Sequence, residues 1–308
     1  MKFFIPLILV LVVLICLANF KKKEVSIMPQ RDLSTIEEKI IIKKGTERPF
    51  TGKHLKNKDS GTYSCRNCGV DLYKSEDKFE SHCGWPSFDD EIDGAVKKTV
   101  DADGRRTEIT CAKCGGHLGH VFEGEQLTDK NLRHCVNSVS LDFTPAGWTT
   151  NTAYFAGGCF WGVEYYMQKL PGVISVVSGY SGGTVENPTY QQVCSGQTGH
   201  LEVVEVKYNP YKVTFEELTK RFLEIHDPTQ SNGQGPDIGS QYLSAIFYST
   251  DEEQKTANHL LDLLKKKKIK PATKVIKFDK FWKAEDYHQD YYNRKDSLPY
   301  CHSYKKLF

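Results

Sequence analysis

The stretch GGCFWG at residues 157–162 separates two segments with different hydrophobic periods. The apolar residues 153–156 before it predict a strand, and the apolar residues within 160–170 recur at the spacing of a helix. Pro171-Gly172 ends that helix. Strand-like and helical segments then alternate, with strands expected at 173–177, 201–208, 242–248 and 273–278, and helices at 215–225 and 252–264. This alternation predicts a two-layer α/β sandwich.

The chain before this stretch has short apolar segments separated by Gly, Asp and Asn. Such a pattern is typical of an antiparallel β domain. Residues 144–151 contain Pro and Gly without apolar periodicity, which indicates a short linker. We therefore expect a mainly-β domain over 47–147 and an α/β domain over 148–308. The strands expected in the first domain are 70–73, 95–100, 106–110, 118–122 and 136–143.

The composition agrees with two folded domains. The chain has 308 residues, of which 39% are hydrophobic and 26% charged. These values are ordinary for soluble domains and exclude a multi-span membrane protein. The 41 basic and 39 acidic residues leave a formal net charge of +2, which disfavours a nucleic-acid-binding protein.

The N-terminus has the character of a targeting segment. Lys2 precedes the apolar residues 3–18, and three lysines follow at 21–23. Residues 1–23 are therefore expected to be a signal peptide or a membrane anchor. The polar residues 24–46 are expected to be a tether. We accordingly expect an exported or anchored protein of the cell envelope, on its extracytoplasmic or periplasmic side, with membrane contact only through this segment.

Four cysteines form two CxxC motifs, at 65–68 and 111–114. Two such motifs complete a tetrahedral site for Zn²⁺. Four thiolates leave no position open for water, so the expected zinc is structural. The alternative is a pair of redox-active motifs or disulfides, which an exported protein can carry. The expected ligands are Cys65, Cys68, Cys111 and Cys114.

Two further cysteines of the first half, Cys83 and Cys135, are candidate reactive thiols. A reactive cysteine needs a stabilised thiolate, which Arg133 and nearby imidazoles would provide. Trp85 offers an apolar wall. The alternative is that these cysteines and histidines are buried structural residues. The histidines concerned are His117 and His120.

Cys159 falls at the first turn of the helix expected after it, where free N–H groups and the helix dipole favour a thiolate. Phe160 and Trp161 offer an apolar pocket with an indole donor. Glu202 alternates with strand valines, and a carboxyl in an apolar pocket has a raised pKa and can donate a proton. The alternative is a buried structural cysteine. Further polar candidates are Tyr190, Asp237 and Tyr242.

Ordered motifs in both halves resemble known families. With its CxxC motifs, CGWPSF, HLGHVF and RHCVNS, the segment 47–144 resembles a B-type methionine sulfoxide reductase. With GGCFWG, NPTY, VCSGQTGHLEVVEV and PDIGSQY, the segment 151–308 resembles an A-type methionine sulfoxide reductase. The resemblance implies a zinc-binding, mainly-β fold followed by a ferredoxin-like α/β sandwich.

The B-type resemblance implies that Cys135 is the nucleophile and Cys83 the resolving thiol. It implies that Trp85 packs on the substrate methyl group. His82 replaces the glycine of many members, which puts the geometry of the loop beside Cys83 in doubt. The residues implied for sulfoxide binding and proton transfer are His117, His120 and Asn137.

The A-type resemblance implies that Cys159 is the nucleophile and Glu202 the proton donor. Phe160 and Trp161 would hold the methyl group. Leu243 departs from the arginine common after the Gln-Tyr pair, which changes surface charge more than chemistry. The hydrogen-bonding partners implied for the substrate are Tyr190, Asp237 and Tyr242.

Two cysteines compete to resolve Cys159. Cys301 lies in a polar segment near the C-terminus, and chain ends are mobile enough to swing toward a sulfenic acid. Cys194 is expected within the folded body. We therefore expect Cys301 to resolve and Cys194 to be structural.

The resemblances together imply a bifunctional enzyme that reduces methionine sulfoxide in proteins or in the free amino acid. The thiolate becomes a sulfenic acid, the resolving thiol forms a disulfide, and a thioredoxin-like dithiol restores the enzyme. The A-type domain would take the S isomer and the B-type domain the R isomer. The alternatives are a general thiol–disulfide oxidoreductase or thiol peroxidase, and a non-catalytic zinc-containing interaction module.

Overall fold

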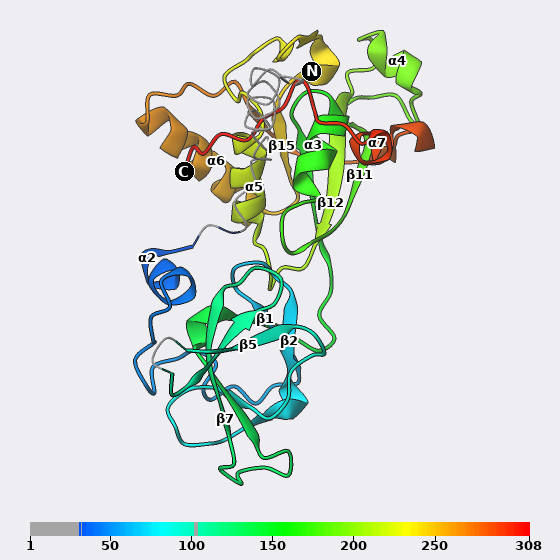
Figure 1. Ribbon diagram of the computed structural model, residues 1–308. Helices are drawn as coiled ribbons and strands as arrows, with labels where there is room; N and C mark the ends of the chain where they lie inside the picture. The colour runs from blue at the N-terminus through cyan, green and yellow to red at the C-terminus, as the bar shows by residue number, and fades with distance from the viewer. Residues whose placement is uncertain (1–30, 32, 102–103) are drawn as a thin grey trace, which may run out of the picture.

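The structure is a computed structural model that describes residue 31 and residues 33–101 and 104–308 (Figure 1). The signal or anchor expected at 1–23 lies outside these residues. Within the described ranges, no helix has both the length and the apolar character needed to cross a bilayer. A sheet-rich domain is followed along the chain by a domain of helices and strands.

The first domain contains two antiparallel sheets. One has the strand order β3-β4-β8-β7-β6-β5 and the other the order β2-β1-β9. Between them Tyr73 stacks on Phe88 with ring centroids 4.3 Å apart, and Tyr63 packs edge-on against Phe88. The strands are β1 (Gly61–Cys65), β2 (Asp71–Lys74), β3 (Lys78–Phe79), β4 (Ser87–Phe88), β5 (Val96–Val100), β6 (Thr107–Cys111), β7 (His117–Glu123), β8 (Leu132–Val136) and β9 (Leu141–Pro145), and a 3₁₀ turn covers Ser75–Asp77.

The strand expected at 136–143 is divided in the structure. β8 ends at Val136, a 3₁₀ turn covers Ser138–Ser140, and β9 then begins in the other sheet. The Asn137 side chain bonds two backbone groups at this point, which favours a break in the strand. The chain therefore passes from one sheet to the other within 136–143, although the sequence pattern predicts a single continuous strand there.

Residues 33–46 differ from the tether that their lysines predict. Helix α2 (Thr35–Glu37) continues into a π-helical turn over Glu38–Ile42. Ile40 and Ile41 are 1% and 2% exposed. Burying one isoleucine contributes roughly 1.5–3 kcal/mol. Ion pairs from Glu37 to Arg66 and from Lys44 to Glu108 add to the attachment of this segment to the first domain.

The second domain is built on one six-stranded sheet with the order β16-β15-β10-β12-β11-β17. Its four central strands are antiparallel and follow the chain order β10-α3-β11-β12-α5-β15, which is the βαββαβ order of a ferredoxin-like sheet. The elements are β10 (Asn151–Ala156), α3 (Phe160–Met167), β11 (Val173–Ser181), α4 (Tyr190–Cys194), β12 (Leu201–Tyr208), α5 (Phe215–Glu224), β13 (Gly233–Gln234), β14 (Asp237–Ile238), β15 (Ala245–Tyr248), α6 (Asp251–Lys266), β16 (Lys274–Lys277), β17 (Phe281–Lys283) and α7 (Tyr291–Lys295), with 3₁₀ turns at Ser240–Tyr242 and Asp286–His288.

Helices α3, α5 and α6 cover one face of this sheet (Figure 1). The main core lies beneath them and includes Phe155 and Phe222, whose ring centroids are 5.0 Å apart. A smaller apolar cluster around Phe247 covers the other face. The strand expected at 242–248 begins only at Ala245, because a 3₁₀ turn occupies Ser240–Tyr242.

The two domains touch beside the first CxxC motif. Lys212 of the second domain donates to Asp71 Oδ1 at 2.6 Å and to the Gly69 carbonyl at 3.2 Å. Arg66 lies 3.8 Å from Glu217 across the same boundary. These three contacts across the boundary are polar.

Candidate active sites and candidate metal centre

Cys159 lies at the junction that the sequence predicts between a strand and a helix. β10 ends at Ala156, and Cys159 is the N-cap residue of α3. Gly158 has φ +94°, and a Cβ there would come within 2.4 Å of the Gln234 side chain. The turn therefore needs glycine, and it holds Cys159 at 7% exposure at the positive end of the helix.

Glu202 reaches the same turn from the neighbouring strand β12. It is 1% exposed, and its Oε2 accepts a hydrogen bond from the Phe160 N–H at 3.0 Å. Burial raises the pKa of Glu202 to about 8, against the lowering effect of that hydrogen bond. The carboxyl is consequently protonated at neutral pH and can donate its proton.

Cys301 is adjacent to Cys159 and is not part of a loose tail. It is 7% exposed, and its thiol and the Cys159 thiol share a hydrogen bond. This hydrogen bond raises the pKa of Cys159 and lowers the pKa of Cys301 to about 6, and His302 lowers the latter further. The expectation that Cys301 must swing in from a mobile end is therefore wrong, because neighbouring groups hold the segment in place: Gln234 donates to the Cys301 carbonyl at 3.2 Å.

Cys194 is also placed differently from the expectation of a core residue. It is the exposed last residue of the short helix α4. It lies beside Tyr190, with which it shares a hydrogen bond. Among the described residues, Cys301 is the cysteine whose thiol contacts Cys159, and its role as the resolving thiol stays a prediction.

The aromatic residues after Cys159 have different surroundings. Phe160 is buried, 1% exposed, with its ring centroid 5.0 Å from that of His288. Trp161 stacks on Tyr291 at 3.7 Å and donates from Nε1 to His288 Nδ1 at 3.1 Å. Sequence reasoning missed His288 and Tyr291, since their segment has no regular hydrophobic period to mark them.

The remaining predicted residues of this site lie around the same turn. Burial raises the pKa of Tyr242 to about 12, and the charges of Glu202 and Cys159 add to this effect. The ring of Tyr190 lies 4.5 Å from that of His288. Asp237 accepts the Tyr300 hydroxyl on both carboxylate oxygens, at 2.9 and 3.0 Å. The C-terminal segment therefore occupies the carboxylate that was predicted to bind substrate.

The first domain holds its own thiol pair. Cys135 lies in β8, and its Sγ is 3.6 Å from Cys83 Sγ. Cross-strand pairing places Ser87 on one side of Cys135 and His120 on the other. Directly opposed residues share one face of a sheet, so the three side chains form a row.

One cation, Arg133, acts on this thiol pair, and it also forms an ion pair with Glu125. The thiol–thiol hydrogen bond raises the pKa of Cys135, as burial does, while Arg133 acts to lower it. The same hydrogen bond, with those of Ser81 and Ser87, lowers the pKa of Cys83 to about 4. The pair thus shares one proton. Among the described residues, the buried Nη1 of Arg133 has no hydrogen-bond partner, which leaves it available to a developing anion.

A cavity of about 120 Å³ opens onto Cys135. Trp85 lines it and is fixed by a hydrogen bond from Nε1 to the Glu47 carbonyl at 2.9 Å. His120 also lines it, with Nε2 3.0 Å from Asp101 Oδ2. An apolar wall and an imidazole therefore face the predicted nucleophile.

Two other predicted residues are engaged in bonds of their own. His117 is 3% exposed and bonds Glu108 at 2.8 Å through Nδ1, and burial lowers its pKa. Asn137 borders the cavity, but its Oδ1 accepts from the Glu47 N–H and its Nδ2 donates to the Leu118 carbonyl. Asn137 thus holds the loop that positions Trp85.

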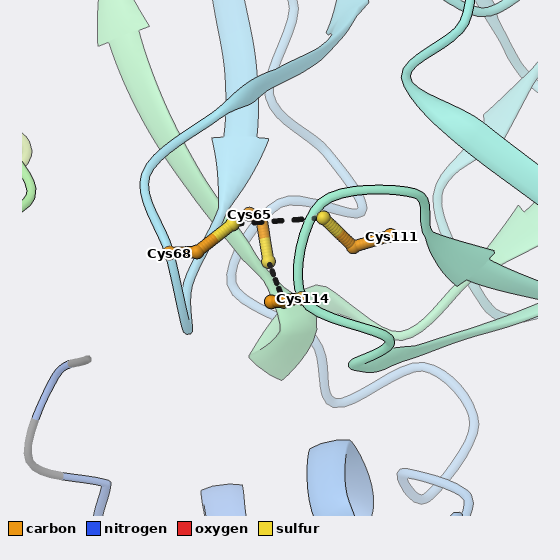
Figure 2. A group of neighbouring side chains, drawn as sticks. All are labelled: Cys65, Cys68, Cys111 and Cys114. Carbon is orange, nitrogen blue, oxygen red and sulfur yellow. Dashed lines mark hydrogen bonds between the residues drawn. The ribbon is translucent and has the colours of Figure 1, made fainter. Parts of the chain in front are cut away.

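The four CxxC cysteines converge at one point (Figure 2). All four sulfurs lie within 4.8 Å of one another. Cys65 Sγ is 3.7 Å from Cys114 Sγ, and Cys68 Sγ is 3.6 Å from Cys111 Sγ. Sulfurs bound tetrahedrally at about 2.3 Å from zinc lie roughly 3.8 Å apart, so this donor set fits the ion.

Each domain thus places one thiol in contact with a second thiol, and the α/β domain adds the protonated carboxyl of Glu202. These features define a thiol-dependent reductase with two sites. A family model described as "Peptide methionine sulfoxide reductase" matches residues 151–307, and one described as "SelR domain" matches residues 33–145. The chain belongs to the peptide methionine sulfoxide reductase family.

Known relatives and solved structures each match about half of this chain. "Peptide methionine sulfoxide reductase MsrA" of Ruthia magnifica is 50% identical over 148 residues, which are 48% of this chain and 89% of that protein. "Peptide methionine sulfoxide reductase MsrA/MsrB" of Vibrio cholerae is 48% identical over 158 residues, 50% of this chain and 41% of that protein. The solved structure of reduced Mxr1 from Saccharomyces cerevisiae covers 51% of this chain and 92% of its own, with 35% identity and a TM-score of 0.48.

The predicted activity is confirmed. The protein carries a B-type domain followed by an A-type domain and reduces methionine sulfoxide at the expense of thiols. The A-type domain is a peptide-methionine (S)-S-oxide reductase and the B-type domain a peptide-methionine (R)-S-oxide reductase.

Proposed function

We propose that both domains run one three-step cycle on their own thiol pair. The supporting observation is that each candidate nucleophile already touches a second thiol: Cys83 with Cys135, and Cys301 with Cys159. Attack on the sulfoxide leaves a sulfenic acid, the second thiol displaces water to form a disulfide, and an external dithiol reduces that disulfide.

In the A-type site, Cys159 attacks the sulfoxide sulfur and Glu202 protonates the oxygen. The raised pKa of Glu202 supports this assignment, because the acid carries its proton at the working pH. Phe160 and Trp161 hold the methyl group. Tyr190, Asp237 and Tyr242 bind the polar part of the substrate, with Asp237 released from Tyr300 when substrate enters.

In the B-type site, Cys135 is the nucleophile and Cys83 the resolving thiol. Arg133 stabilises the thiolate, which its effect on the Cys135 pKa supports. Trp85 packs on the methyl group, and His120, which lies directly opposite Cys135 in the sheet and lines the cavity, delivers a proton. His117 and Asn137 hold the surrounding backbone and His120 in position.

We further propose that Cys65, Cys68, Cys111 and Cys114 bind one structural Zn²⁺. The ion would join the β1–β2 turn to the β6–β7 turn, and with four thiolates it would have no open position for substrate. Its contribution would be to the stability of the first domain.

The reductant is proposed to be a thioredoxin-like dithiol protein, since each turnover leaves a disulfide that only two-electron thiol exchange returns to the starting state. The protein is proposed to act at the cell envelope in the repair of oxidised proteins. This location follows from the N-terminal sequence alone, and wholly cytosolic protein in fractionated cells would contradict it.

Mapping the disulfides after one turnover tests the cycle. The protein, without reductant, is given the R or the S diastereomer of a blocked methionine sulfoxide and then analysed by mass spectrometry. We expect the R isomer to produce only Cys83–Cys135 and the S isomer only Cys159–Cys301. A disulfide at Cys194, or one within the CxxC motifs, would contradict the assignment.

A further inference from the structure

His302 lies against the resolving thiol and has no role in the cycle described so far. Its Nδ1 is 3.0 Å from Cys301 Sγ, and its Nε2 is 2.7 Å from the Gly157 carbonyl. The side chain is 4% exposed. Cys301, the residue before His302 in the sequence, is therefore also its hydrogen-bond partner.

The hydrogen bonds fix which nitrogen of His302 carries the proton. A carbonyl oxygen can only accept, so Nε2 donates to Gly157. In the neutral imidazole, Nδ1 is then the acceptor and faces the thiol of Cys301. The ring is thus oriented as a base, and the backbone of GGCFWG sets that orientation.

The same motif provides the space for the ring. A Cβ on Gly162 would lie 2.2 Å from His302 Nδ1, so residue 162 must be glycine for the histidine to reach this position. The adjoining backbone is held as well: the Ser303 N–H donates to the Ile225 carbonyl at 3.1 Å, and the Tyr166 hydroxyl donates to the His302 carbonyl at 3.4 Å. His302 is therefore pre-positioned before any substrate binds.

We propose that His302 is the general base of the resolving step in the A-type site. The proposal rests on Cys301 being the resolving thiol. With Cys159 present as a sulfenic acid, His302 Nδ1 takes the Cys301 proton and Cys301 Sγ attacks Cys159 Sγ. The S–S bond forms, the S–O bond of the sulfenic acid breaks, and the leaving hydroxide takes the proton from the imidazolium as water. No external oxidant or reductant enters this step.

Other titratable groups face the Cys301–His302 pair from the elements packed around it. Helix α3 contributes its N-cap residue and one tyrosine, and α7 and the C-terminal segment contribute one tyrosine each. One acidic residue comes from β12, another from β14, and a histidine comes from the segment after α5. In chain order these groups are Cys159, Tyr166, Glu202, His226, Asp237, Tyr292 and Tyr300. Among these, Glu202 and Asp237 carry carboxyl groups, and His226 carries a second imidazole.

A single-turnover experiment separates the resolving step from the step before it. The full chain is mixed with excess S isomer without reductant, and both methionine release and loss of free thiol are followed. For His302→Gln, whose amide can still donate to Gly157, we expect methionine release at the wild-type rate. One thiol is lost with methionine release, as Cys159 becomes a sulfenic acid, so the resolving step is the loss of the second thiol. That second loss should slow by about 10²–10⁴-fold, the usual contribution of a positioned base.

The pH profile separates a base from a structural residue. The Cys159 thiol and His302 both lower the pKa of Cys301, and neither acts in His302→Gln once Cys159 is a sulfenic acid. Cys301 must then ionise by itself, so loss of the second thiol should rise about tenfold per pH unit below the pKa of the thiol. The wild type should show a much flatter profile between pH 6 and 8. His302→Asn, which keeps a polar group near Cys301, should behave as His302→Gln does.

Two outcomes would overturn the proposal: loss of the second thiol at the wild-type rate in both variants, or equal slowing of methionine release and of that second loss. Cys301→Ser tests the underlying assignment independently. If that variant still loses two thiols per turnover, the assignment of Cys301 as the resolving thiol fails, whatever His302 does.

Discussion

The Phe160 N–H donates to Glu202 Oε2 at 3.0 Å, and this hydrogen bond joins the first turn of α3 to the middle of β12. Phe160 directly follows the nucleophile, so the acid is placed relative to Cys159 by backbone geometry. A carboxyl that accepts one backbone hydrogen bond on one oxygen keeps the other oxygen for its proton. The relationship thereby fixes both the position and the direction of proton delivery.

Glu202→Gln should abolish most S-isomer reduction, with kcat/KM falling about 10²–10⁴-fold because no proton reaches the sulfoxide oxygen. R-isomer reduction is the internal control and should not change. In the wild type, the raised pKa of Cys159 makes its thiolate fraction grow with pH. S-isomer kcat/KM should therefore rise up to about pH 8 and then become level, because Glu202 loses its proton there. A rise that continues unchanged to pH 9.5 would exclude Glu202 as the acid.

The same substitution should not lower stability. The folded-state pKa of Glu202 is raised above its unfolded value of 4.5, so the folded state binds the extra proton between about pH 4.5 and 8, and stability falls as pH rises through that window. Gln removes this dependence. Thermal unfolding at pH 8 should therefore show Glu202→Gln at least as stable as the wild type, and a clearly lower Tm would contradict the burial effect.

Arg133→Met should reduce R-isomer kcat/KM by roughly 10–100-fold at pH 7, because the cation that opposes the raised pKa of Cys135 is removed. The loss should diminish as pH rises and the thiol ionises unaided. Glu125→Gln is the matched control: Glu125 accepts from Arg133 Nε at 2.6 Å, and its removal leaves the cation in place. Equal losses in both variants would assign Arg133 a purely structural role.

Tyr300→Phe should lower the KM for the S isomer a few-fold, because the hydroxyl that occupies both oxygens of Asp237 is lost. Tyr211→Phe removes a hydroxyl from an exposed tyrosine elsewhere in the same domain and should have no effect. Steady-state kinetics at several S-isomer concentrations provide the measurement. A raised KM in Tyr300→Phe would show that the tyrosine supports substrate binding instead of competing with it.

Cys68→Ser should lower the zinc content, measured by elemental analysis, from one ion per chain to well below one. The first domain should lose stability by more than 10 °C in Tm, since a structural zinc supplies folding free energy directly. R-isomer reduction should fall with it, while S-isomer reduction persists. Cys194→Ser, an exposed cysteine outside the cluster, is the control. A metal-free but fully active wild type would contradict the zinc proposal.

Much of the second domain could be predicted from its sequence. Helix α6 begins at Asp251, where Thr250 and Glu253 form a capping box, and it ends among lysines. Neighbouring residues therefore determine both of its ends. The strand β12 is found at the predicted residues 201–208. Regular periods and caps are properties of neighbouring residues, which is why sequence reasoning finds them.

The differences arise where distant residues decide the structure. The isoleucines at 40–42 sit among lysines, and only the surface of the first domain explains why two of them are buried. Cys301 and His302 lie in a segment without regular structure, held by contacts to α3, α5 and the β13 segment. The pair Cys301-His302 was visible as adjacent residues, but the glycine that admits the ring lies far away in sequence, at 162.

The central claim is that two independent sites act on different isomers, with Cys135 and Cys159 as their nucleophiles. Measuring each activity after each cysteine is replaced tests this claim most directly. The wild type, Cys135→Ser and Cys159→Ser would be assayed on the separated R and S diastereomers of a blocked methionine sulfoxide, with dithiothreitol as reductant. Cys135→Ser should lose only R-isomer reduction and Cys159→Ser only S-isomer reduction. Loss of both activities in either variant, or retention of both, would contradict two independent sites with these nucleophiles.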